Sequence, residues 1–265
     1  MRRDATAGTL LIAMLFGFGL GPAQAATAAS FADLAALSLA APVVVHATAI
    51  KDQRLSPRDA PGLAAGMARF LVTATTTAAI VAPADVPPRL TYLIDLAVDA
   101  RGKAPKPVAR EVLLFLRPGT AAGQYALIDG HAELPWTAAA EATVRSVLTD
   151  NRRGTVPIVT GIASAFRVPG GVPGEAESQF FVSTRDGKPV SLVVLTRPGE
   201  QRQLTIALGD VIDDAAAGVP PATLLWYRLA CGLPPALPPS AGAVADVADD
   251  YRFVLHSLGP CGRTF

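Results

Sequence analysis

The residues whose types could do chemistry are few and widely spaced in this chain. Histidine occurs only at His46, His131 and His256, which fall in three separate predicted elements. A three-histidine metal site needs all three to converge, and their spacing gives no reason to expect one. The G-x-S-x-G, S-x-x-K and H-E-x-x-H motifs are absent, as is a phosphate-binding glycine loop. We therefore expect no cofactor and no metal, and we assign no catalytic residue.

Asp95 and Asp99 lie four residues apart on a predicted strand and so point to the same face. At about 3.3 Å per residue, their carboxylates are about 13 Å apart. Inverting glycosidases use a spacing of roughly 6.5–9.5 Å, so these two residues alone cannot form an acid–base pair. Carboxylates from distant segments leave no local signature. An envelope hydrolase with a carboxylate or histidine site assembled from such segments therefore stays open as an alternative function.

A cluster of basic residues is the best local candidate for a binding site. It lies in a loop with glycine and proline between two predicted strands, and it consists of Arg101, Lys103, Lys106 and Arg110. In OB-like barrels such loops often form the ligand cleft, and four cations could hold a phosphate or carboxylate polymer. A solvated hairpin tip explains the same pattern. If the protein binds an anionic ligand such as a glycan, we expect it at this loop.

Cys231 and Cys261 are the two cysteines of the chain. An even count in an exported protein favours one disulfide over two free thiols. Closing a loop of roughly 30 residues stabilises a fold by about 3–4 kcal/mol in the chain-entropy model. The competing hypothesis makes Cys231 a nucleophile with His256 as its base. An oxidising compartment argues against a resting thiolate, so the sequence predicts the disulfide.

The first 25 residues have the three parts of a secretory signal peptide. Arg2 and Arg3 form a basic head, an apolar run follows over residues 10–20, and an A-x-A site ends between Ala25 and Ala26. The apolar run is shorter than the roughly 20 residues that span a bilayer. We therefore expect cleavage after Ala25, a periplasmic or secreted location of the kind found in Gram-negative bacteria, and no transmembrane segment in the mature protein.

The charge balance of the mature chain argues against two classes of partner. Removing the predicted signal peptide takes away Arg2, Arg3 and Asp4 and lowers the formal net charge from +1 to 0. A neutral surface gives no general attraction to nucleic acid or to an anionic membrane. The remaining 240 residues are enough for one large domain or two small ones. We expect two domains, at residues 26–153 and 154–265.

The first domain is predicted to be a small antiparallel β-barrel that ends in a helix. Two long stretches alternate apolar and polar residues, which is the period of a half-buried strand. An OB-like barrel is the preferred fold, and a β-sandwich is the rival that periodicity cannot separate. Ser30 and Asp33 resemble a capping box at the start of a first helix. The predicted strands are 43–50, 69–81, 90–99, 111–116 and 124–128, and the predicted helices are 31–39 and 137–149.

The second domain is predicted to be a β-meander covered by a helix pair that the disulfide staples. Asp186-Gly187 is a strong hairpin signal, and the strand that follows it is apolar on both faces, so something must cover it. The whole chain is thus a β-rich α+β protein. In the second domain the predicted strands are 179–184, 190–196 and 204–208, and the predicted helices are 223–233 and 247–258.

Two large side chains are expected to have structural roles. Trp136, which follows Pro135, is expected to plug the end of the barrel. Arg228, in a helix predicted to be buried on most sides, needs a carboxylate partner, for which Asp249 and Asp250 are the candidates.

The sequence is typical of a soluble exported protein without catalytic activity that binds a ligand or another protein. An envelope protein or an anionic glycan is the expected partner. The absence of catalytic motifs weakens the case for an enzyme without closing it.

Overall fold

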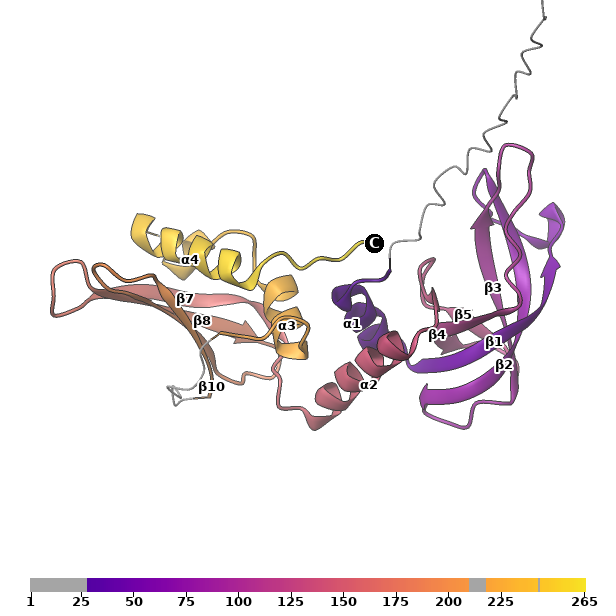
Figure 1. Cartoon of the computed structure of the whole chain (residues 1–265), viewed down its shortest axis with the longest axis horizontal. Coiled ribbons are helices and arrows are strands. Elements are labelled where there is room, and N and C mark those ends of the chain that lie inside the picture. The colour runs from indigo at the N-terminus through magenta and orange to yellow at the C-terminus, as the bar shows by residue number, and fades with distance from the viewer. Residues whose placement is uncertain (1–27, 210–217, 243) are drawn as a thin grey trace, which may run out of the picture.

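The structure is a computed structural model and describes residues 28–209, 218–242 and 244–265. Figure 1 shows two β-rich units side by side, with three helices, α1, α2 and α3, between the two sheets. The predicted signal peptide and its cleavage point between Ala25 and Ala26 lie outside the described residues. Among the described residues, no helix is long and apolar enough to cross a membrane.

The N-terminal unit is built on an antiparallel sheet that curls into a nearly closed barrel. Its strands pair in the order β3-β2-β1-β4-β5, and β6 also pairs with β4. A parallel bridge between Thr91 and Gln124 brings β3 alongside β5, and the Thr91 N–H donates to the Gly123 carbonyl at 2.8 Å. The strands are β1 (Val43–Arg54), β2 (Met67–Val81), β3 (Arg89–Ala97), β4 (Arg110–Pro118), β5 (Tyr125–Leu127) and β6 (Glu133–Pro135).

The alternation predicted for the long strands is present, and it fills the barrel. Leu90, Tyr92 and Ile94 of β3 are buried in the same core as Phe70 and Val72 of β2. Because the side-chain period of a strand is two, the intervening residues face outward. Shifts of register in β1 against β2 mark bulges, which bend a strand and increase its twist. The prediction of a barrel-like sheet is confirmed.

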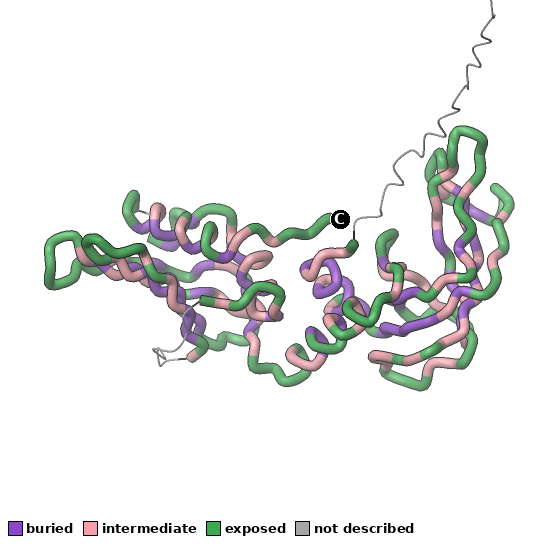
Figure 2. Tube along the Cα trace, in the orientation of Figure 1, coloured by how far each residue is buried: buried purple, intermediate pink, exposed green. Residues whose placement is uncertain are grey.

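Two helices cover the outer face of β1 and β4. Helix α1 (Phe31–Ala40) starts with the predicted capping box, in which the Asp33 N–H donates to Ser30 Oγ at 3.1 Å. Helix α2 (Ala138–Arg153) ends at Gly154, whose φ of 66° favours glycine. Both helices pack on apolar side chains that point out of the barrel, and Figure 2 shows the buried stretches along the strands and on the inner sides of the helices.

The C-terminal unit has one more strand than predicted. Among its described residues, an antiparallel sheet runs in the order β10-β9-β8-β7, with helices on one face (Figure 1). The missed strand is β7, in which Gly161 and Ser164 interrupt the apolar pattern. The elements are β7 (Val159–Pro169), β8 (Ala176–Thr184), β9 (Val190–Thr196), β10 (Gln203–Leu208), α3 (Leu224–Gly232) and α4 (Ala245–Leu258), with short 3-10 helices at Pro57–Asp59 and Pro239–Ala241.

The predicted disulfide between Cys231 and Cys261 is confirmed. It fixes the end of α3 to residues 259–265, which we call the C-terminal strap. The strap reaches the N-terminal unit, where the Thr264 N–H donates to Asp33 Oδ1 at 2.9 Å and the Phe265 ring stacks on His131 at 4.5 Å. The strap therefore connects the two units along a path separate from the chain between α2 and β7.

Two expectations about large side chains are wrong. Trp136 does not plug the barrel; it stacks on His46 at 4.5 Å on the outer face, beneath α2, because the short strand β6 carries it there. Arg228 does not pair with Asp249 or Asp250. Asp250 is held inside the C-terminal unit by Arg167 and by Ser178 Oγ, while Arg228 points away toward α2.

Candidate functional site

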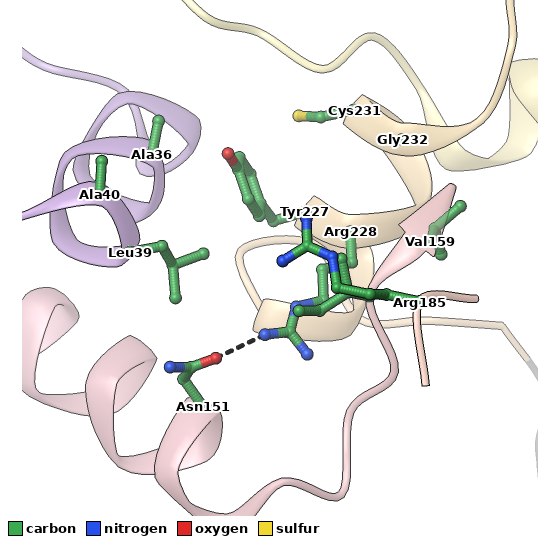
Figure 3. Close-up of a pocket in the computed structure, with 11 residues that line it drawn as sticks. Ala36, Leu39, Ala40, Asn151, Val159, Arg185, Tyr227, Arg228, Cys231 and Gly232 are labelled. Carbon is green, nitrogen blue, oxygen red and sulfur yellow. Dashed lines mark hydrogen bonds between the residues drawn. The ribbon is translucent and has the colours of Figure 1, made fainter. Parts of the chain in front are cut away.

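A pocket of about 530 Å³ lies where the helices of the two units meet, and we call it the inter-unit pocket. Its walls form because α1, α2 and α3 share a small core of Ala35, Val147 and Leu224, one residue from each helix. Figure 3 shows the side chains around the hollow. The lining residues are Ala36, Leu39, Ala40, Asn151, Ile158, Val159, Arg185, Tyr227, Arg228, Cys231 and Gly232.

Arg228 is the central polar group of this pocket. Thr223 caps the start of α3 by accepting a hydrogen bond from the Trp226 N–H at 3.2 Å, and Arg228 follows one turn later. The residue is only 8% exposed. Its guanidinium donates to Asn151 Oδ1 at 2.6 Å and to the Val156 carbonyl. Both acceptors are neutral, and within the described ranges no carboxylate forms an ion pair with Arg228.

Further positive charge surrounds Arg228. Arg185 lies on the turn after β8, where its backbone N–H donates to the Ile158 carbonyl at 2.9 Å. Burial lowers the pKa of Arg228. The nearby Asp186 carboxylate offsets part of this lowering, and repulsion from Arg185, which is the smaller of these two effects, adds to it. Asp186 is itself paired with Lys188 at 3.2 Å. A guanidinium does not lose its proton in a protein, so Arg228 stays a buried cation that, within the described residues, has no carboxylate in direct contact.

Tyr227 adds a neutral donor at the same place. Burial raises the pKa of its phenol, although Arg263 of the C-terminal strap and Arg228 both act to lower it. The phenol therefore keeps its proton near neutral pH and can donate a hydrogen bond. Arg263 thus places a positive charge of the C-terminal strap near Tyr227.

The rest of the pocket wall is apolar. Ala36, Leu39 and Ala40 of α1 face the hollow from one side, opposite Val159 at the start of β7 (Figure 3). Gly232 permits the end of α3 to approach β7, because a Cβ there would lie 3.1 Å from Val159 Cβ. The pocket thus combines a cationic end with an apolar wall.

Among the described residues that line the pocket there is no carboxylate and no histidine, and Cys231 is held in the disulfide. In the parts of the chain that the structure describes, no cluster of three or more His, Cys, Asp or Glu residues could hold a metal ion.

A second hollow of about 640 Å³ lies on the outside of the barrel between β3 and β5. Asp95, Asp129 and His131 are among its lining residues. Arg69 holds Asp95 with two hydrogen bonds of 2.7 Å, and this pairing keeps the pKa of the Asp95 carboxyl below its usual range. Asp129 Oδ1 accepts the His131 backbone N–H at 2.7 Å. Both carboxylates thus already have partners within the protein.

In the structure, one of the four basic residues predicted as a ligand site, Arg110, has a different environment from the other three. Arg101, Lys103 and Lys106 are exposed in the loop between β3 and β4. Arg110 instead starts β4 and pairs with Glu133, whose side chain is 5% exposed. Its charge is therefore already compensated. Anion binding by the loop stays a prediction.

Asp99 shapes this loop instead of serving as a free acid. Its Oδ1 accepts the backbone N–H groups of Arg101 and Lys103, each at 2.9 Å. Arg54 of β1 donates to the Gly102 carbonyl at 3.1 Å and adds a cation that the sequence did not indicate.

The residues of the inter-unit pocket were not predicted as a site. They come from five separate segments, and only the packing of the two units brings them together. One signal was present, because Arg228 was recognised as a buried cation in need of a partner. The sequence matches no family model and no curated protein sequence.

Proposed function

We propose that this protein is an exported, non-catalytic binding module that holds a small anionic molecule in the inter-unit pocket. The observation that carries the proposal is the environment of Arg228, a buried guanidinium with neutral hydrogen-bond partners in the described residues and a second guanidinium beside it.

Removing a charge from water costs several kcal/mol per ion even after the protein relaxes. Carbonyl oxygens satisfy the N–H groups of Arg228 but carry no net charge to offset this cost. A bound anion supplies that charge, and a carboxylate can accept two parallel hydrogen bonds from one guanidinium. Arg185 and Arg228 together offer the anion two guanidinium groups as hydrogen-bond donors.

Titration calorimetry with sodium hexanoate at fixed ionic strength tests the proposal. We expect saturable one-site binding to the exported protein and an affinity about tenfold or more lower for Arg185→Gln, because a hydrogen bond to a charged group contributes about 1.5–3 kcal/mol. Arg185 is exposed, so its replacement leaves the fold intact.

The matched control is Arg197→Gln, which removes the same charge from the turn at the other end of β9. It should leave the affinity unchanged. Equal affinities for the wild type and Arg185→Gln would show that the pocket is not the site.

Export is part of the proposal and is supported by two features. The first 25 residues have the pattern of a signal peptide, and the Cys231–Cys261 disulfide is of a kind that persists in oxidising compartments. We place the mature protein in the periplasm or outside the cell.

We also propose that the N-terminal barrel is OB-like. The support is its strand order, in which β1 pairs with β2 and β4, β2 with β3, and β4 with β5, while a parallel bridge joins β3 to β5. This ring of five strands supports the proposal, because an OB-fold is a small, partly open Greek-key barrel of five strands.

The alternative of an envelope hydrolase has one feature in its favour, which is the second hollow with Asp95, Asp129 and His131 in its lining. A general acid needs a raised pKa, whereas Arg69 lowers the pKa of Asp95. We therefore propose binding instead of hydrolysis.

A further inference from the structure

We infer that the ligand of the inter-unit pocket is a carboxylic acid with a compact apolar body. This inference rests on the proposed function, and it adds the chemical class of the anion and the orientation in which the pocket takes it.

The cationic end of the pocket suits a single carboxylate. A guanidinium is planar and presents paired N–H donors whose spacing matches the two oxygens of a carboxylate. Arg228 already gives one hydrogen bond to Asn151 and one to Val156, so its remaining donors, with those of Arg185, are available to a ligand. The Tyr227 phenol lines the same pocket and is a third donor.

The side of the pocket formed by α1 cannot satisfy further oxygen atoms. Ala36, Leu39 and Ala40 offer it no polar side chain. A phosphate head would place additional charged oxygens near these residues, and a buried polar group without a partner costs about 1–3 kcal/mol. A carboxylate directs all of its charge toward the arginines and leaves an apolar body to cover α1.

The volume of the pocket is large enough to hold an apolar group in addition to the carboxylate. This volume of about 530 Å³ lies in the range of sites that bind small organic molecules. An acetate ion would leave the apolar wall in contact with water. Each methylene buried against this wall should raise the affinity about fourfold, which follows from the usual transfer free energy of a methylene.

The test is a calorimetric series on the exported protein with acetate, butanoate, hexanoate, inorganic phosphate and hexanol. We expect the affinity to rise at least tenfold from acetate to hexanoate. Phosphate, which lacks the body, and hexanol, which lacks the charge, should each bind at least tenfold more weakly than hexanoate.

A substitution in the apolar wall separates the contribution of the carboxylate to the affinity from that of the apolar chain. Leu39→Asn should weaken hexanoate several-fold and leave acetate unchanged. Leu93→Asn is the matched control, because it replaces an exposed leucine on the outside of the barrel, and it should change neither affinity. Thermal unfolding of both variants checks that the fold is retained.

The outcomes distinguish this inference from the function on which it rests. If acetate or phosphate binds as tightly as hexanoate and Arg185→Gln weakens all of them, the pocket is an anion site and the inference about the apolar body is wrong. If no anion binds, or Arg185→Gln changes nothing, the proposed function fails as well.

Discussion

Replacing both cysteines with serine should lower the free energy of unfolding by about 3 kcal/mol. The disulfide joins residues 30 apart, and closing a loop of this length restricts the unfolded chain by about that amount in the chain-entropy model. Urea unfolding of the exported wild type and of the Cys231→Ser, Cys261→Ser variant measures the difference. The intact mass of the wild-type protein should show a start at Ala26 and two fewer hydrogens than the reduced chain.

The disulfide also holds the C-terminal strap against α1. Burial would raise the pKa of the Asp33 carboxyl, but hydrogen bonds from Thr264 and Ser30 outweigh it and lower the pKa. A chain ending at Arg263 keeps the disulfide and loses these contacts with Thr264 and Phe265. It is the control for the cysteine variant, and it should lose less stability. Equal stability of the cysteine variant and the wild type would contradict the structural role of the disulfide.

Replacing Arg110 with methionine should destabilise the protein by about 2 kcal/mol at neutral pH. Removing one partner of a buried ion pair costs about 3–5 kcal/mol, and the partial exposure of Arg110 reduces this figure. Burial already raises the pKa of Glu133, although Arg110 and a hydrogen bond of 2.7 Å from the Tyr92 hydroxyl act against it. Without Arg110 the Glu133 carboxylate would stay buried with no countercharge from β4.

The pH dependence of this variant follows from the same pair. A carboxyl whose pKa is raised in the folded state opposes folding above its unfolded pKa, and the penalty disappears as the pH falls and the group is protonated. The cost of Arg110→Met should therefore be largest near pH 7 and shrink toward pH 4, as urea unfolding at both values would show. Arg101→Gln, in the exposed loop, should stay within about 0.5 kcal/mol of the wild type. If the two substitutions lowered the free energy of unfolding equally, the structural role assigned to the Arg110–Glu133 ion pair would be contradicted.

Local patterns predicted most of the elements. The capping box at Ser30 and Asp33, the hairpin turn at Asp186-Gly187 and the pairing of Cys231 with Cys261 depend on residues that are close in sequence or on a simple count. Strand β7 was missed because small and polar residues break its alternation, although helices α3 and α4 cover its apolar positions.

The candidate site depends on packing that no local pattern reports. Arg228 was correctly expected to be buried, and its partner was wrongly sought on α4. The structure turns the guanidinium toward Asn151, because α3 packs against α1 and α2 of the other unit. Arg110 differs from its basic neighbours in sequence, because its partner Glu133 lies on β6, a strand of three residues that the sequence did not indicate.

The most direct test of the account is the NMR signal of the Arg228 Nε–H group in uniformly 15N-labelled exported protein, assigned by its loss in Arg228→Lys. We predict that hexanoate shifts this signal saturably, with the dissociation constant found by calorimetry, and leaves the signal of Arg69, which is already paired with Asp95, in place. An Arg228 signal that does not move while hexanoate binds would contradict the central claim, because the anion would then be held elsewhere.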